Sequence, residues 1–144
     1  MKKAIILGLL FISSIISIHA QNWLTDIEEA KTSAAKENRN IILVFQGSDW
    51  CAPCMKLEKE IWNTDEFKEY SKEHFILLKA DFPRKRKNKL ESVQQEKNMQ
   101  LAEKYNKQGF FPMVVVLDKE GNVLGRTGYE KMEVSEYIKL LESF

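Results

Sequence analysis

The predicted fold depends on one short stretch, Trp50-Cys51-Ala52-Pro53-Cys54. Cys51 and Cys54 are the only cysteines of the 144 residues, and two residues separate them. Residues 40–46, directly before the stretch, read Asn-Ile-Ile-Leu-Val-Phe-Gln, a composition typical of a buried β-strand. Residues 55–62, directly after it, have the composition of a helix, with apolar Leu57 and Ile61 one turn apart. The cysteine pair is therefore predicted to lie where a strand passes into a helix.

This position has a chemical consequence for the two thiols. The first cysteine would lie at a helix N-terminus, where free backbone N–H groups and the positive end of the helix dipole favour a thiolate. A thiolate is the form that attacks a disulfide, and the second thiol is close enough to resolve the mixed disulfide. We therefore predict a redox-active pair, with Cys51 as the nucleophile and Cys54 as the resolving thiol.

Three other roles for the cysteines are less consistent with the sequence. A zinc site needs about four ligands, or three with an open position, and His74 is the only further Cys or His after residue 20. A structural disulfide that closes so short a loop would remove little entropy from the unfolded chain. Two inert core cysteines remain an alternative, although the flanking Trp50 and the intervening Pro53 argue against a fortuitous pair.

The stretch also resembles the active-site motif of the thioredoxin superfamily, from whose commonest form it differs by Ala52 in place of glycine. The resemblance extends over almost all of the chain after residue 20. It implies an α/β fold, the thioredoxin fold, in which a central mixed sheet of about four strands is flanked by helices. It also implies a helix at the N-terminus of the domain and a cis-proline before the third strand.

Hydrophobic patterns along the chain agree with this fold. Strands are predicted at residues 40–46, 75–81, 114–117 and 123–127. Helices are predicted at residues 23–38, 55–62 and 133–142, from Asn63 or Thr64 through Tyr70, and over about 90–106. The first two strands enclose helices in strand–helix–strand order, which implies a parallel pair.

The segment Gly109-Phe110-Phe111-Pro112-Met113 precedes the strand at 114–117. In the thioredoxin-like family a cis-proline begins this strand beside the dithiol, and Pro112 matches it by position. The family pairs the substrate backbone against the residue before that proline, here Phe111, which is bulkier than the usual occupant. Trp50 would cover the site. The resemblance thus makes Trp50, Phe111 and Pro112 the expected substrate-binding residues.

Resolution by Cys54 requires that its proton be removed, and a nearby base would help. Cytoplasmic thioredoxins carry a buried aspartate in the strand before the motif, where this chain has Phe45 by position. Glu58 lies four residues beyond Cys54, on the same helix face, and is the candidate base. The exported thioredoxin-like domain of transmembrane thiol–disulfide interchange proteins has a glutamate at this spacing. The alternative is that Glu58 is an ordinary solvated carboxylate.

Residues 1–20 have the pattern of a secretory signal peptide: a basic start, an apolar run from Ala4 to Ile18 and a small residue at Ala20. We expect cleavage after Ala20, with an uncleaved N-terminal anchor as the alternative. Residues 21–144 then form one thioredoxin-like domain. Loss of Lys2 and Lys3 changes the formal charge from +1 to about −1, which gives no reason to expect nucleic-acid binding. The predicted location is the periplasm, or alternatively outside the cell.

Residues 84–89 hold five cationic side chains in six positions. Such a cluster is either a docking patch for an acidic partner or an anionic membrane, or a solvated loop that aids solubility. At the level of sequence the solvated loop is the preferred interpretation.

These observations predict an exported thiol–disulfide oxidoreductase that reduces protein disulfides through Cys51 and Cys54. Ala52-Pro53 between the cysteines resembles the reducing members of the family. We expect a membrane protein as electron donor, a monomeric state, and no metal or external cofactor. An oxidase or isomerase would use the same two sulfurs. A Cu(I)-binding thiol module is an alternative of a different class, which needs further soft ligands such as Met55 or His74 near the pair.

Overall fold

The computed structural model describes residues 21–144, so the expected signal peptide and its cleavage site after Ala20 lie outside the described residues. In chain order the elements are β1 (Trp23–Leu24), α1 (Ile27–Glu37), β2 (Asn40–Gln46), α2 (Ala52–Leu57), the π-helix η1 (Glu58–Trp62), α3 (Asp65–His74), β3 (Phe75–Asp81), the 3₁₀ turn η2 (Arg86–Asn88), α4 (Ser92–Tyr105), β4 (Met113–Leu117), β5 (Val123–Thr127) and α5 (Val134–Glu142). Within this part of the chain, none of the helices combines the length and apolar character that crossing a membrane requires.

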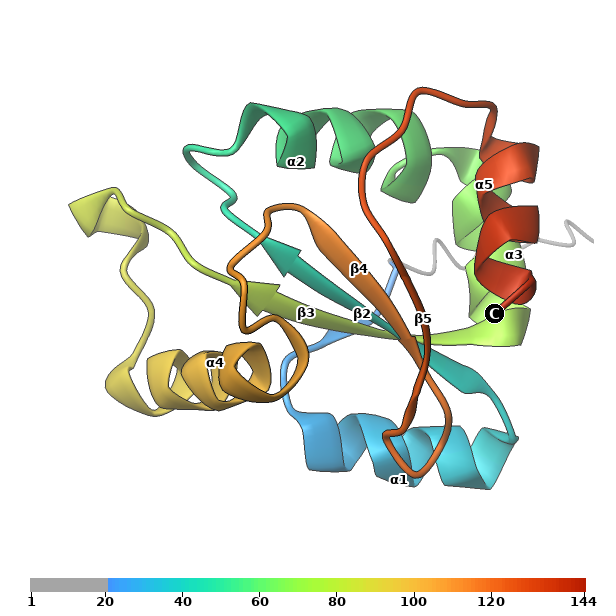
Figure 1. Cartoon of the computed structure of the whole chain (residues 1–144), viewed down its shortest axis with the longest axis horizontal. Helices are drawn as coiled ribbons and strands as arrows, with labels where there is room; N and C mark the ends of the chain where they lie inside the picture. Colours follow the sequence, from blue (N-terminus) through green and yellow to red (C-terminus); the bar gives the residue numbers. More distant parts are fainter. Residues whose placement is uncertain (1–20) are drawn as a thin grey trace, which may run out of the picture.

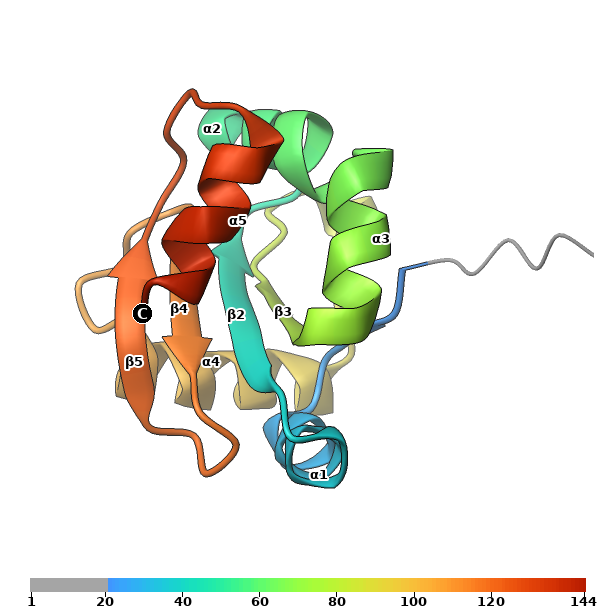
Figure 2. The ribbon, with the colours of Figure 1, turned by 90° about the vertical axis from the view of Figure 1, so that its right-hand side faces the viewer.

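The strands form one mixed sheet in the order β1-β3-β2-β4-β5 (Figures 1 and 2). β3 runs parallel to both β1 and β2, whereas β4 runs antiparallel to β2 and β5. The parallel pair of β2 and β3 and the mixed sheet are therefore as predicted. The sheet has one strand more than the four expected, because β1 adds to the edge of β3.

The extra strand explains why the first predicted helix starts later than expected. Trp23 and Leu24 pair with β3, and the helix begins only at Ile27. Asp26 is extended and caps this helix, because its carboxylate accepts backbone N–H groups two and three residues further on, at 2.9 and 3.1 Å. The predicted N-terminal helix of the domain is confirmed, with its start moved from residue 23 to Ile27.

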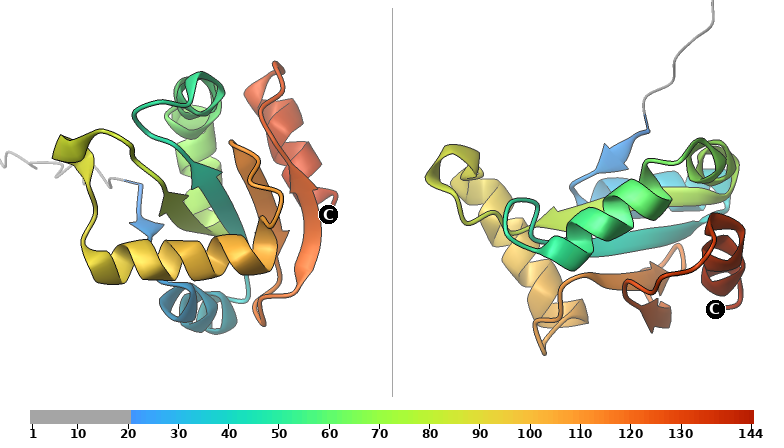
Figure 3. Two further views of the ribbon diagram at one scale, coloured as in Figure 1. Left: turned by 60° about the vertical axis from the view of Figure 1, so that its left-hand side comes forward. Right: turned by 90° about the horizontal axis from the view of Figure 1, so that it is seen from above.

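Helices cover both faces of the sheet, so the domain has two hydrophobic clusters (Figures 2 and 3). One cluster lies under α2, η1, α3 and α5, and the other lies over α1 and α4. The central strand β2 is buried on both sides and sends alternate side chains to the two clusters: Ile42 and Val44 to the first; Ile41, Leu43 and Phe45 to the second.

The helix after the cysteines runs unbroken from Ala52 to Trp62, but its second half is a π-helix. The N–H of Asn63 donates to the carbonyl of Glu58, five residues earlier, at 2.8 Å. This wider turn brings Ile61 and Trp62 into the core, where Trp62 makes edge-to-face contacts with three other aromatic rings. The helix that carries the cysteines is thus fixed to the core at its far end.

Sheet register brings three loops together at one end of the sheet. Gln46 at the end of β2 is opposite Asp81 at the end of β3, and Phe45 is opposite Met113 at the start of β4. The segments that follow β2 and β3 and the segment that precedes β4 therefore meet at the same edge, although they are far apart in the sequence.

Candidate active site

The cysteines lie where β2 gives way to α2, as predicted. A turn directly after the strand is closed by the Gly47 carbonyl, which accepts the N–H of Cys51 at 2.9 Å. Cys51 is extended and is the N-cap of α2: its Sγ accepts the N–H of Cys54 at 3.3 Å. Pro53 lies in the first helical turn, where no backbone N–H is required. Cys51 therefore has the helix-terminal position that favours a thiolate when the pair is reduced.

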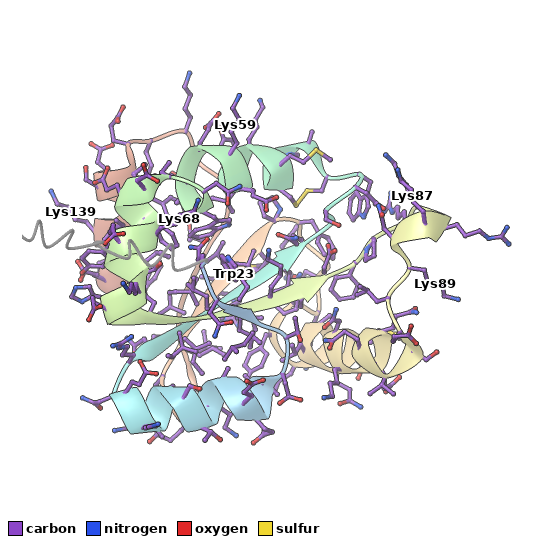
Figure 4. The ribbon with its side chains drawn as sticks, turned by 180° about the vertical axis from the view of Figure 1, so that it is seen from behind. Trp23, Lys59, Lys68, Lys87, Lys89 and Lys139 are labelled. Carbon is purple, nitrogen blue, oxygen red and sulfur yellow. A yellow bond between two sulfur atoms is a disulfide. The ribbon has the colours of Figure 1, made fainter. Side chains whose placement is uncertain are left out.

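The two sulfurs are joined in a disulfide, with 5.2 Å between the Cα atoms, and Figure 4 shows it at the start of α2. Each cysteine retains only 4% of its surface exposed. The disulfide thus lies directly beneath the surface, and a substrate sulfur must approach it through the loops that surround it.

Trp50, which directly precedes Cys51, is in contact with protein groups on several sides. Its ring lies against the backbone at Gly47, where a Cβ atom would come within 2.2–2.5 Å of ring atoms. The indole Nε1–H donates to the carbonyl of Phe82 at 2.7 Å, and the Arg84 guanidinium lies 3.7 Å from the ring centroid. Phe111 packs edge-to-face on the same ring at 5.4 Å. Trp50 and Phe111, two of the three expected substrate-binding residues, are thus in contact.

Pro112, the third expected residue, precedes β4, and the Phe111–Pro112 peptide bond is cis. The carbonyl oxygen of Pro112 lies close to Gly128, where an added Cβ would be only 3.3 Å from it. The Phe111 ring also contacts Phe82, at 5.5 Å between centroids. The segment before β4 is therefore packed between the loop that follows β3 and the end of β5.

A groove of about 640 Å³ borders this aromatic cluster. One wall is formed by Phe82, Pro83 and Arg84, and the other by residues 109–111, with Trp50 between them. Phe110 on the second wall is 55% exposed, so its ring is open to solvent on this side of the groove. The groove offers a mainly apolar surface against Trp50, the residue that precedes Cys51.

Asp49 connects the loop before the cysteines to residues 82–89, which we call the basic arm. Its carboxylate accepts the backbone N–H groups of Arg84 and Lys85 and the side-chain amide of Asn88, each at 2.9 Å. These donors, the Arg84 N–H first, hold the pKa of Asp49 below its ordinary value of 3.8. The sequence alone did not identify this role, because a polar residue in a loop is unremarkable without knowledge of what lies opposite.

Glu58, the candidate base, begins the π-helix one turn beyond Cys54, and its N–H donates to the Cys54 carbonyl. Its side chain is partly exposed, and within residues 21–144 no hydrogen bond or ion pair ties its carboxylate in place. The side chain of Phe45, which by its position in the sequence corresponds to the buried aspartate of cytoplasmic thioredoxins, packs in the cluster with α1 and α4. It therefore does not occupy the position that faces α2, the helix that carries Cys54. The alternation of β2 assigns that position to Gln46, whose side chain is buried.

Of the two additional soft ligands suggested by the sequence, His74 is remote from the cysteines. Met55 is 44% exposed, and His74 is stacked on Tyr70 at the far end of α3, with 4.0 Å between ring centroids. Across the described residues, no three His, Cys, Asp or Glu side chains are grouped in a way that would hold a metal ion. The sulfur pair is thus the reactive group that the geometry singles out.

Comparison with known proteins agrees with this geometry. The thioredoxin-like family model matches residues 22–119. The chain belongs to the thioredoxin-like family. Within that family it is 35% identical to the "Disulfide bond reductase DsbH" of Chlamydia pneumoniae over 115 residues, which are 80% of this chain and 68% of the relative.

Solved structures of thioredoxin-like proteins are similar over most of the domain. A structure named "DsbH Oxidoreductase" has a TM-score of 0.79 and 32% identity, and the match covers 94% of this chain and 92% of that one. The C-terminal domain of DsbD from Neisseria meningitidis, in its reduced form, has the same fold at a TM-score of 0.54 and 22% identity, over 81% and 92% of the two chains. The predicted thioredoxin fold is confirmed, and the chain is a thioredoxin-like thiol–disulfide oxidoreductase with Cys51 and Cys54 as its disulfide.

Proposed function

We propose that the protein is an exported reductase of protein disulfides. The observation that carries this proposal is the placement of Cys51 Sγ at the first turn of α2, where it accepts the Cys54 N–H at 3.3 Å. A thiolate formed there would be stabilised by that N–H and by the helix dipole. The relative named as a disulfide bond reductase supports the direction of electron flow. The apolar run and Ala20 within residues 1–20 support export.

In the proposed reaction the reduced enzyme starts with a Cys51 thiolate and a Cys54 thiol. The thiolate attacks one sulfur of the substrate disulfide, and the other substrate sulfur leaves as a thiolate that takes up a proton. Cys54 then loses its proton and attacks the Cys51 sulfur, which expels the second substrate sulfur. Two electrons pass to the substrate, and Cys51 and Cys54 end as a disulfide. A dithiol on a membrane protein would return the enzyme to its reduced form.

Two sets of side chains would assist these steps. Trp50, Phe111 and Pro112 would hold the substrate backbone beside Cys51, and the contact between Trp50 and Phe111 supports this grouping. Glu58 would accept the Cys54 proton, directly or through one water molecule, because it lies one helical turn away. Protein disulfides are the proposed substrates, and we propose that the enzyme acts as a monomer.

The reduction potential of the Cys51–Cys54 pair tests the direction of the reaction. Equilibration with a series of glutathione redox buffers should give a value near that of thioredoxin, about −270 mV. A value near the strongly oxidising exported enzymes, about −120 mV, would show that the pair instead oxidises its targets.

The roles of the two sulfurs can be tested separately. Cys51→Ser should abolish turnover of a disulfide-linked peptide, because no nucleophile remains. Cys54→Ser should accumulate a mixed disulfide between Cys51 and the peptide, detectable by intact mass. Normal turnover by the Cys54→Ser variant would show that the assignment of roles is wrong.

A further inference from the structure

The basic arm projects from the body of the domain at the end of the sheet where the disulfide lies (Figures 1 and 3). It leaves the end of β3 and turns back through η2 before α4 begins. Its five cationic side chains are all exposed: Arg84, Lys85, Arg86, Lys87 and Lys89. Lys87 and Lys89 lie on the side of the molecule that is nearer to the disulfide, and Lys68 and Lys139 lie at the opposite end (Figure 4).

The arm is attached to the active site and is not a free loop. Asp49 binds two of its backbone N–H groups and the Asn88 amide. Phe82 and Arg84 contact Trp50, one through a hydrogen bond and the other through the face of the ring. Attachment therefore relies mainly on the arm's main chain and on its first residues, and the lysine side chains are left to point into solvent.

No cationic side chain of the arm forms an ion pair within residues 21–144, although the nearby charge of Lys85 contributes to the lowered pKa of Asp49. The ion pairs found there are Lys31–Glu28, Arg39–Glu37 and Lys97–Asp26, none of which involves the arm. The arm thus concentrates positive charge next to the groove that Trp50 and Arg84 line, in a domain whose overall charge is close to zero. Such a patch attracts anionic groups and increases their rate of encounter.

We propose that the basic arm is a docking surface for an acidic segment of the substrate polypeptide, next to the cysteine that Cys51 attacks. The proposal rests on the proposed function and specifies its substrates: proteins with Asp or Glu near the target disulfide. A loop that served solubility alone would not require fixed contacts with Asp49 and with the aromatic ring beside the disulfide. The positions of Asp49 and Trp50 thus favour docking over the solvated loop that the sequence suggested.

Two matched peptides test the proposal. Both carry the same disulfide, and one has three Asp residues beside it where the other has three Asn residues. The reduced wild-type protein should show a kcat/KM about tenfold higher for the Asp peptide at low salt. This preference should fall to about twofold or less at 0.5 M salt, since the Debye length shrinks from about 10 Å at 0.1 M to about 3 Å at 1 M.

Matched variants locate the effect. Lys85→Gln, Lys87→Gln and Lys89→Gln together should reduce the preference for the Asp peptide to less than about twofold at low salt. Lys68→Gln, Lys72→Gln and Lys139→Gln together remove the same charge from α3 and α5 and should retain the tenfold preference. Urea denaturation of both triple variants checks that the fold is intact.

Several results would overturn the proposal. The first is equal kcat/KM for the two peptides with wild-type protein, and the second is an equal loss of preference in the two triple variants. A third is binding of wild-type protein, but not of the arm variant, to phosphatidylglycerol vesicles without any peptide preference, which would assign the arm to a membrane surface. If the wild type reduces neither peptide, the proposed function fails; the affinity of the oxidised protein for a fluorescent Asp peptide then still tests docking by itself.

Discussion

Gly47→Ala should displace Trp50, because the new Cβ would lie 2.2–2.5 Å from three ring atoms, whereas ordinary contacts are 3.4–4 Å. The ring must therefore move by roughly 1 Å. Its hydrogen bond to Phe82 and its contacts with Arg84 and Phe111 resist that movement. Overpacking in a fixed environment costs about 1–3 kcal/mol, and loss of the indole bond alone accounts for about 0.5–1.5 kcal/mol. We expect the free energy of unfolding to fall by about 1–3 kcal/mol.

A double-mutant cycle measures this clash specifically. Unfolding in urea gives the effect of Gly47→Ala in the wild type and in the Trp50→Ala background, where the ring is absent. Gly47 does not have a positive φ angle, so alanine itself fits the backbone, and in that background the loss should be below about 0.5 kcal/mol. The Nε1–H resonance of Trp50 should shift in the single variant. An equal loss of stability in both backgrounds would refute the reasoning.

Three further predictions concern helix capping, acid pH and catalysis. Thr64→Ala should lower the free energy of unfolding by about 1 kcal/mol in urea, because the hydroxyl caps α3 by accepting an N–H at 3.2 Å; an unchanged midpoint would contradict this. The pKa of Asp49 lies below 3.8, so the carboxylate should keep its bonds to the basic arm above that pH and lose them as the pH falls through the lowered pKa. The loss should appear as a shift of the Trp50 Nε1–H resonance in the NMR spectrum. Asp49→Asn should show the same shift already at neutral pH. Glu58→Gln should slow release of the mixed disulfide by about 10²-fold in stopped-flow kinetics; a similar loss in the control Glu60→Gln would exclude a specific role for Glu58.

The parts of the fold that the sequence predicted are those with strong local signals. The buried strands at residues 40–46 and 75–81 are apolar runs whose composition suits the centre of a sheet. The two cysteines lie at the predicted junction between strand and helix. This boundary was predictable because a β-branched run stands directly before the motif and helix-forming residues stand directly after it. Two-residue β1 has no such signal: Trp23 and Leu24 fit an amphipathic helix equally well, and only pairing with β3 decides.

The rest of the site depends on contacts between distant residues. Asp49 and Arg84 are separated by 35 positions and meet only because β2 and β3 end side by side. Which residue of β2 faces α2 has a similar origin, because the alternation of the strand puts Phe45 in the cluster with α1 and α4 and leaves Gln46 on the side of α2. Sequence reasoning counted residues back from the motif, and a count cannot register which face of the strand each residue occupies.

In the basic arm, backbone groups fix the position of the loop, and side chains supply the charge that it presents to solvent. Peptide N–H groups of Arg84 and Lys85 make the bonds to Asp49, and any residue except proline would supply them. The side chains of Lys85, Arg86, Lys87 and Lys89 can therefore be replaced without loss of these bonds, whereas the Arg84 side chain also packs on the ring of Trp50. Under the proposed docking role, substitution of these few exposed side chains would redirect the enzyme from acidic to basic or neutral targets, and the chemistry at the two sulfurs would be unchanged.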